Sequence, residues 1–168
     1  NKIDAFANLP IQSFNLAITT FVGQNMGARE YERVKKGIRI CMSMTLCATI
    51  LLSLGIFTQA DRLLSIFSSE SQVLYYGHYM MSILVPGYIF LAVSNILCGA
   101  LRGAGDAITP MLILTFSYCV ARQIWIFFAM PHFQNIAVVF WGYTLTWILA
   151  MVLCTVHYFK SGWMKKYA

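Results

Sequence analysis

Long apolar runs alternate with short polar or charged segments along the whole chain. The runs predict five membrane-spanning helices, over residues 4–24, 40–59, 76–101, 109–130 and 136–158. A helix needs about 20 mostly apolar residues to cross the hydrocarbon core of a bilayer, and each run reaches that length. The charged segment 29–39 could belong to a soluble protein, but the apolar runs on either side are too long for that. We therefore expect an all-α, polytopic membrane protein.

The first predicted span is the least apolar, because polar residues recur on one of its faces. Steps of three and four residues place five of them within an arc of about 80°. They are Asp4, Asn8, Gln12, Asn15 and Thr19. Unpaired polar groups are costly in hydrocarbon, so this stripe must face other helices or water. It could supply hydrogen bonds between helices or line an aqueous cavity, and we favour the cavity. Pro10 interrupts this helix and could bend it.

The second and third predicted spans differ in their polar content. The second has only Ser, Thr and Cys, which can bond to the helix backbone, and we expect it to be lipid-facing scaffold. Ser69 and Gln72 resemble a capping box, which predicts that the third helix starts near Glu70. Pro86 and Gly87 should kink that helix, either as a hinge or as a static bend packed against a neighbour.

The fourth predicted span has a clear start signal and one embedded charge. Thr109 as the N-cap and Pro110 at the first helical position are typical of a helix start. Tyr118 and Arg122 are four residues apart and hence lie on one face. An arginine within a span is a functional candidate. Arg122 could instead extend toward the outer interface or form a structural pair, and we favour these two alternatives over a functional role. We expect seven residues to line a substrate cavity: Asn8, Gln12, Asn15 and Thr19 of the stripe, Asn95, Tyr118 and Arg122.

The basic residues predict the orientation of the spans. Nine of the twelve fall on one side: Arg29, Arg33, Lys35, Lys36, Arg39, Arg102, Lys160, Lys165 and Lys166. Lys2 and Arg62 fall on the other side, and Arg122 is embedded. Cytoplasmic loops of membrane proteins are enriched in Lys and Arg, so we expect the N-terminus outside and the C-terminus in the cytoplasm.

Composition favours a lipid bilayer as the partner and argues against nucleic acid. The 168 residues are 59% hydrophobic and 11% charged, with a mean hydropathy of +0.67. Soluble domains carry about 25% charged residues. The net charge of +6 arises from residues between the apolar runs, which indicates a positive-inside bias rather than a phosphate-binding surface. We expect the protein in a plasma membrane, such as a bacterial inner membrane.

Candidate chemistry is sparse. The five cysteines lie within apolar runs without a CxxC pair, and we interpret them as small buried hydrophobes, with neither a metal site nor a disulfide. The sequence contains no HExxH, P-loop, GxSxG or dinucleotide motif, so we expect neither an enzyme nor a cofactor. The chain starts at Asn1 rather than Met, and we interpret it as part of a longer protein.

Two segments, in their order and separation, resemble a known transporter family. Their sequences are FVGQNMGAREYERVKKG (21–37) and LCGALRGAGDAITPML (97–112). The first resembles the loop after the second helix of a lobe in multidrug and toxin extrusion (MATE) transporters. The second resembles the segment between the fourth and fifth helices of the same lobe. The resemblance covers nearly all of the chain and implies five helices of a six-helix C-terminal lobe, without the first helix of that lobe and without the N-terminal lobe.

The resemblance also implies a function. MATE transporters are secondary antiporters that export cationic or amphipathic compounds in exchange for Na⁺ or H⁺, by rocking two lobes around a central cavity. In one sodium-coupled branch, carboxylates on the first and fourth helices of the C-terminal lobe bind the ion. The equivalent of the fourth helix here, residues 76–101, has no Asp or Glu, so we expect the ion to bind mainly outside this chain. The alternatives are a lipid-linked oligosaccharide flippase of the same superfamily and a non-transporting membrane scaffold.

Overall fold

The computed structural model of the protein describes residues 2–65, 70–132 and 135–163. Every regular element in these ranges is a helix, which confirms the expected all-α fold. In chain order the elements are α1 (Lys2–Gly27), α2 (Tyr31–Thr58), α3 (Ala60–Ser65), α4 (Ser71–Gly103), α5 (Ile108–Thr115), the π-helical segment η1 (Phe116–Ala121), α6 (Arg122–Ala129) and α7 (Ala137–Lys160).

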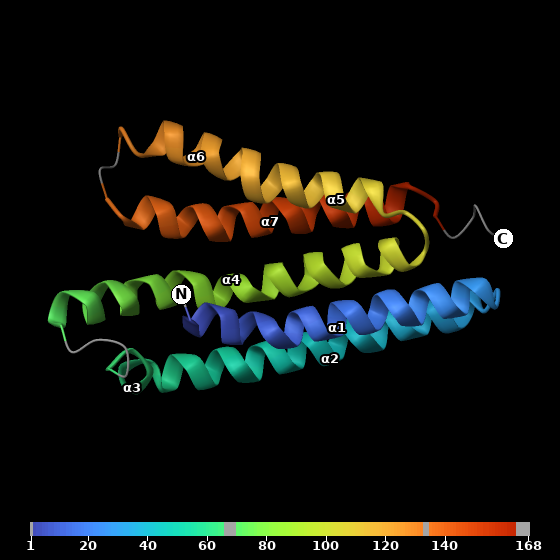
Figure 1. Ribbon diagram of the computed structural model, residues 1–168, viewed down its shortest axis with the longest axis horizontal. Helices are drawn as coiled ribbons and strands as arrows, with labels where there is room; N and C mark the ends of the chain where they lie inside the picture. Colours follow the sequence, from blue (N-terminus) through green and yellow to red (C-terminus); the bar gives the residue numbers. More distant parts are fainter. Residues whose placement is uncertain (1, 66–69, 133–134, 164–168) are drawn as a thin grey trace.

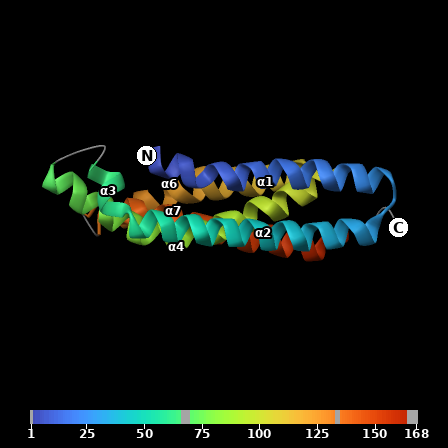
Figure 2. The same ribbon diagram turned by 90° about the horizontal axis from the view of Figure 1, so that it is seen from below.

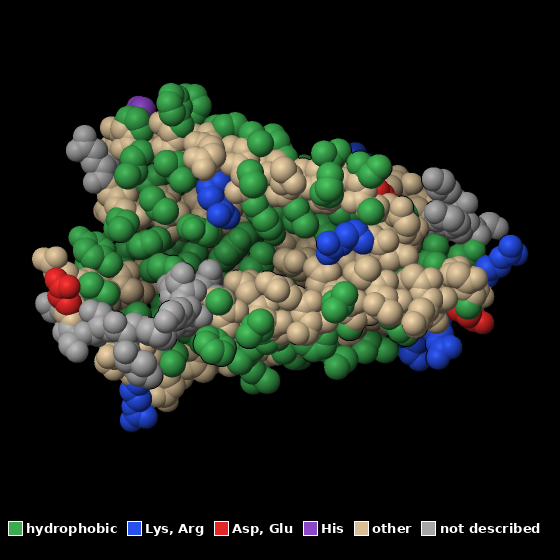
Figure 3. All heavy atoms as spheres, viewed as in Figure 1, with side chains coloured by type: hydrophobic (Ala, Val, Ile, Leu, Met, Phe, Trp, Pro, Cys, Tyr) green, Lys and Arg blue, Asp and Glu red, His purple; other side chains and the backbone are tan. Residues whose placement is uncertain are grey.

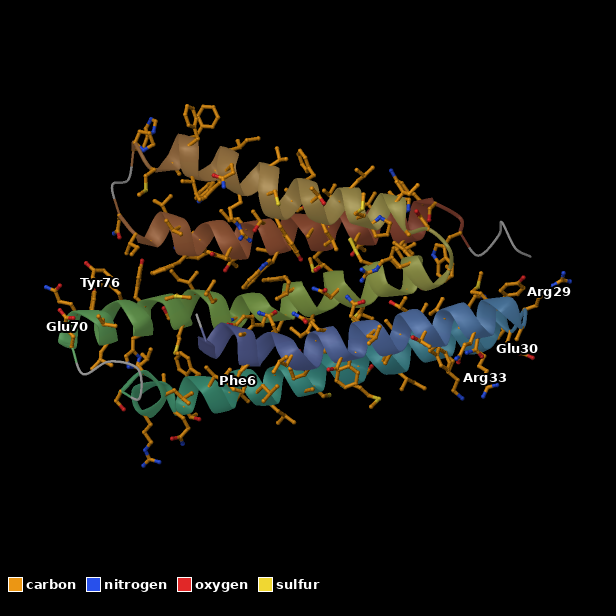
Figure 4. All side chains as sticks on the ribbon, in the orientation of Figure 1. Phe6, Arg29, Glu30, Arg33, Glu70 and Tyr76 are labelled. Carbon is orange, nitrogen blue, oxygen red and sulfur yellow. A yellow bond between two sulfur atoms is a disulfide. The ribbon has the colours of Figure 1, made fainter. Side chains whose placement is uncertain are left out.

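The long helices lie in two groups that meet at α4 (Figures 1 and 2). α4 packs against α1 and α2 in one group and against α7 in the other. α5, η1 and α6 follow one another without interruption and pack along α7. The turn between α1 and α2, the start of α5 and the end of α7 lie at one end of the bundle. Arg29 and Arg33 lie at that end, and Glu70 and Tyr76 at the other (Figure 4).

Four helical stretches are long and apolar enough to cross a bilayer. They are Tyr31–Thr58, Gln72–Gly103, Ile108–Ala129 and Ala137–Lys160, and they correspond to the second to fifth predicted spans. α1 is not among them, because its polar stripe lowers its apolar content. Its 26 residues nevertheless extend about 39 Å at 1.5 Å per residue, more than the thickness of the hydrocarbon core. That α1 crosses the membrane stays a prediction.

The starts of α2 and α4 differ from the predicted positions. α2 starts at Tyr31, so Arg33 and its basic neighbours up to Arg39 lie on the first turns of a helix rather than in a loop. α4 starts at Ser71, close to the predicted position; Ser69, the predicted cap, lies outside the described residues.

The predicted cap of the fourth span is wrong. α5 starts at Ile108, and the backbone N–H of Thr109 donates to Oδ1 of Asp106 at 3.3 Å. Ala107 is the N-cap residue, and the carboxylate just before it satisfies one free N–H of the first turn and places a negative charge at the positive end of the helix. The stronger acceptor three residues upstream therefore replaces the Thr109 hydroxyl.

α2 exposes a broad apolar surface, as expected of a lipid-facing helix. Its exposed large side chains are Ile40, Met44, Ile50, Leu51, Leu52, Leu54 and Phe57. Thr45 donates to the carbonyl of Cys41 at 2.7 Å, as the sequence predicts for hydroxyls on this helix. Thr49 and Ser53 differ from that prediction, because their buried hydroxyls have no hydrogen-bond partner among the described residues.

Cys98 on α4 and Cys154 on α7 form a disulfide, with a Cα–Cα distance of 6.3 Å. Both residues are fully buried. The predicted burial is confirmed for these two cysteines but is wrong for Cys47 and Cys119, which are exposed. The prediction that no disulfide forms is also wrong. The two residues are 56 positions apart and come together only because α4 and α7 pack along each other, which no local spacing reveals.

Two glycines allow α1 and α4 to approach closely. A Cβ added at Gly103 would contact the carbonyl oxygen of Thr19 and lie 2.8 Å from Cβ of Val22. A Cβ added at Gly99 would lie 2.8 Å from Oδ1 of Asn15 and 2.9 Å from Cγ2 of Ile18. Gly99 and Gly103 are four residues apart on one face of α4, the spacing of small residues at tight interfaces between membrane helices.

Asp106 also joins the start of α5 to the end of α7. Its Oδ2 lies 2.6 Å from Nε2 of His157. Partial burial acts to raise the pKa of Asp106, but the hydrogen bonds with His157 and Thr109 outweigh burial and hold that pKa below its ordinary value. This turn therefore stabilises the ionised form of Asp106.

We predict that Gly103→Ala destabilises the protein by about 1–3 kcal/mol, because the added methyl meets backbone that cannot move aside. Gly55→Ala is the control, since a Cβ there meets nothing within 4 Å. Thermal unfolding of the purified protein in detergent measures both. A Gly103→Ala variant as stable as wild type would contradict the close approach.

We also predict a pH-dependent effect of Asp106→Asn. Because folding lowers the pKa of Asp106, its stabilisation is complete above the unfolded value of about 3.9 and is lost as the pH falls through the lower folded value. The variant should unfold at a lower temperature than wild type at pH 6, and the difference should shrink toward pH 3. An equal difference at both pH values would show that the ionised carboxylate is not the stabilising form.

Candidate functional site

The polar stripe of α1 meets α4 through a small hydrogen-bond network. Asn15 is 9% exposed, and its Nδ2 donates to Oδ1 of Asn95 at 3.0 Å. Nη2 of Arg102 donates to Oδ1 of Asn15 at 2.7 Å. Asn95 in turn donates to the carbonyl of Leu91 at 2.9 Å. Asn15 therefore uses both ends of its amide to join α1 to α4.

Arg102 is a site residue that reasoning from the sequence misses, because the count of basic residues places this side chain in a cytoplasmic loop. It lies in the last turn of α4, and its guanidinium is directed back to α1. Asn95 and Arg102 are seven residues apart, so they lie on the same face of α4. That spacing could have identified Arg102 from the sequence.

A cavity of about 220 Å³ lies next to this network. It is lined by Gln12, Asn15, Leu16, Thr19 and Arg102. Thr19 donates to the carbonyls of Asn15 at 2.8 Å and Gly99 at 3.1 Å, so its hydroxyl is occupied. Gln12 is exposed, and within the described residues its amide makes no hydrogen bond. Of the stripe, Gln12 is thus the residue most able to bind a ligand, whereas Asn15 and Thr19 hold helices together.

A second polar cluster lies in the other group of helices. Nη2 of Arg122 donates to Oγ1 of Thr146 at 3.2 Å, and its guanidinium carbon lies 4.0 Å from the centre of the Tyr143 ring. Both partners belong to α7. These contacts agree with the structural pair rather than with a side chain extended toward the lipid headgroups. The buried Nε of Arg122 has no hydrogen-bond partner among the described residues.

Arg122 directly follows the π-helical segment η1, which lies in the middle of the fourth span. Tyr118 lies within η1, and its hydroxyl is 3.4 Å from Oγ of the buried Ser94 on α4. π-helical turns inside α-helices are rare and occur often at functional sites. The sequence predicts a regular helix here and does not reveal this segment.

The seven predicted cavity residues thus form two sets. Asn8, Gln12, Asn15 and Thr19 lie on α1, where Asn15 bonds to Asn95 on α4, and Tyr118 and Arg122 contact α4 and α7. Asn8 is half-buried on α1. Between the two groups of helices the surface is hollowed and lined largely by hydrophobic side chains, with basic side chains along it (Figure 3). That the residues line a substrate path stays a prediction.

The three predicted hinge residues lie within continuous helices. α1 runs through Pro10 and α4 runs through Pro86. Gly87 is packed against α7, since an added Cβ would lie 2.9 Å from the Trp147 ring and 3.0 Å from Oγ1 of Thr144. Thr144 donates to the carbonyl of Ile83 at 3.2 Å, next to the bond that Pro86 cannot make. In this conformation Gly87 is packed against α7, and the role of Pro10, Pro86 and Gly87 as hinges stays a prediction.

The arrangement offers binding groups: neutral amides, hydroxyls and two guanidiniums. Neither Arg102 nor Arg122 forms an ion pair with a carboxylate of the described residues. No group of three or more His, Cys, Asp or Glu side chains that could hold a metal ion exists in the part of the chain that the structure describes.

Apolar helices of membrane-spanning length, with polar groups turned toward one another, define a multi-pass membrane protein. A family model described as MatE matches residues 1–128. The chain therefore belongs to the MatE family, and the predicted family resemblance is confirmed.

Individual relatives agree with this assignment. The chain is 24% identical to the probable multidrug resistance protein YoeA of Bacillus subtilis over 99% of its length, and 28% identical to the probable multidrug resistance protein NorM of Thermotoga maritima over 98%. Among solved structures, a point mutant of the Vibrio cholerae MATE transporter VcmN matches 93% of the chain with a TM-score of 0.82 and 18% identity.

The chain spans about a third of the length of these relatives. It covers 36% of YoeA, 36% of the Thermotoga NorM and 35% of the VcmN chain.

We predict that Arg102 and Asn15 are energetically coupled. A double-mutant cycle with Arg102→Met and Asn15→Leu should give a coupling energy of about 1.5–3 kcal/mol, the range for a hydrogen bond from a charged group. A parallel cycle with Gln12→Leu is the control, since Gln12 lines the same cavity without a hydrogen bond to Arg102. Unfolding in detergent provides the energies, and equal coupling in the two cycles would argue against a specific bond.

Proposed function

We propose that the chain forms part of a drug-exporting membrane transporter, as five helices of its C-terminal lobe. The observation that carries the proposal is the α1–α4 cavity with its exposed Gln12, found in a chain whose matched relatives are named multidrug resistance proteins. A neutral amide can donate and accept hydrogen bonds. Such weak contacts suit a carrier that must release cationic and amphipathic substrates of varied shape.

Transport would be coupled to Na⁺ or H⁺. α4 contains no Asp or Glu between Ser71 and Gly103, and neither do α5, η1 and α6. A transport ion needs oxygen ligands or a titratable carboxylate, and these four segments supply no carboxylate. We therefore place the coupling ion mainly in the partner lobe, which the proposed transporter needs to close its cavity.

The basic end of the bundle would face the cytoplasm. Arg29 and Arg33 lie at this end together with the last turn of α7, and the excess of Lys and Arg there is typical of cytoplasmic segments (Figure 4). The matched relatives come from bacteria, which supports the inner membrane as the location.

One observation favours a second function. Two guanidiniums, from the exposed Arg102 and the half-buried Arg122, have no carboxylate partner among the described residues. Arginine forks match the geometry of phosphate and carboxylate groups. An anionic cargo, as in the lipid-linked oligosaccharide flippases, would use these charges.

The test uses Gln12→Ala and Asn15→Ala in the full-length protein, with efflux of several cationic dyes measured against membrane abundance. Gln12→Ala should change apparent affinity several-fold, differently for each dye, because one hydrogen bond contributes about 0.5–1.5 kcal/mol. Abundance should stay the same. Asn15→Ala should lower abundance and affect all dyes alike, because its amide holds α1 to α4.

Ser13→Ala is the matched control, since this exposed hydroxyl donates to the carbonyl of Leu9 on its own helix at 3.0 Å. It should change neither affinity nor abundance. If efflux in Gln12→Ala falls only in proportion to abundance, the cavity role is wrong. Export confined to anionic compounds, abolished by Arg122→Gln, would establish the second function instead, and absence of any export would leave the scaffold.

A further inference from the structure

A large cavity at the basic end of the bundle has no place in the proposed transport path. Its volume is about 710 Å³. It lies between the first turns of α2, the last part of α4 and the end of α7, and its walls include Lys35, Arg39, Ser43, Leu97, Tyr158 and Trp163. The cavity beside Gln12 shares none of its lining residues.

We propose that this cavity binds an anionic phospholipid, with the phosphate of the headgroup at Arg39 and Lys35. Arg39 is exposed and forms no ion pair within the described residues, so its guanidinium is available to a phosphate. Nζ of Lys35 lies 2.6 Å from Oε1 of Glu32, which reduces its net charge contribution and makes it the secondary contact. Arginine binds phosphate oxygens through two parallel hydrogen bonds.

The remaining walls fit a lipid better than a soluble anion. Ile38, Met42, Leu97 and Phe159 make the cavity mostly apolar below its two charges. Ile50 and Phe57 are exposed further along α2 on the same face as Arg39, where acyl chains would lie. A free phosphate or sugar phosphate gains nothing from these surfaces, whereas a phospholipid covers them.

The position along the membrane normal is also suitable. Trp163 and Tyr158 contact each other at the end of α7, with their ring centres 5.4 Å apart and the ring planes inclined by 55°. Tyrosine and tryptophan concentrate at the level of the lipid headgroups. Basic pockets between membrane helices on the cytoplasmic side bind anionic headgroups. The cavity thus combines basic groups for the phosphate, aromatic rings at the level of the headgroup and an apolar wall for the acyl chains.

The test measures binding of phosphatidylglycerol and phosphatidylcholine to the purified full-length protein in detergent, by native mass spectrometry. Phosphatidylglycerol should bind more tightly. The double variant Lys35→Gln/Arg39→Gln should weaken its binding about 25-fold, at about five-fold for each basic residue near the headgroups. The matched control is Arg33→Gln/Lys36→Gln, which removes the same charge from exposed positions on the same helix outside the cavity. It should change binding less than about two-fold, because the long-range attraction of a screened surface charge is weak.

A second variant keeps the charge and removes the space. Ser43→Trp should fill the cavity from the α2 wall and also weaken phosphatidylglycerol binding, with thermal unfolding confirming that the protein is folded. Equal losses in the two double variants would reveal unspecific attraction and overturn the proposal. So would equal affinity for both lipids, or competition by glycerol 3-phosphate as strong as by the lipid. Because no transport is measured, failure here leaves the proposed function untouched.

Discussion

The structure depends on one constraint, that polar groups in hydrocarbon must find their partners within the protein. α1 carries more amide side chains than α2, α4 or α7, and only a close neighbour can satisfy them. Gly99 and Gly103 provide that neighbour, because the absence of side chains lets the α4 backbone reach α1. Asn15 then reaches Asn95 and Arg102 across the contact. The glycines and the polar network therefore depend on each other. The close approach makes the hydrogen bonds possible, and the hydrogen bonds fix the register of α1 against α4.

The central place of α4 follows from the same constraint. It contacts α1 and α2 through one face and α7 through another, so both groups of helices depend on it. On the α7 side the contact is aromatic and sulfur-rich, with Tyr88 stacked on Trp147 at 5.6 Å and Cys98 joined to Cys154. On the α1 side, glycines and polar groups lie among buried aliphatic side chains such as Ile11 and Ile18.

How much the sequence predicts varies along the chain. Four spans follow from apolar length alone, and the basic residues gather at one end as predicted, since both are properties of composition along the chain. Reasoning from the sequence misses Arg102 because it counts the positive charge without considering which face of α4 carries the side chain. The Cys98–Cys154 contact and the π-helical segment before Arg122 depend on how distant helices pack, and no local pattern contains them. The residue types of the candidate site are predictable from the sequence. The sequence does not show that the Asn15 amide is hydrogen-bonded to α4 while Gln12 stays exposed.

The central claim is that α1 crosses the bilayer despite its polar stripe, with its partners supplied by α4. Labelling of single cysteines in a cysteine-free, full-length protein tests it most directly, with a membrane-impermeant maleimide on intact cells. Ala5→Cys, near the start of α1, should react in intact cells. Arg29→Cys, just past its end, should react only after the cells are opened. Labelling of both positions from the same side would show that α1 does not cross and would contradict the account.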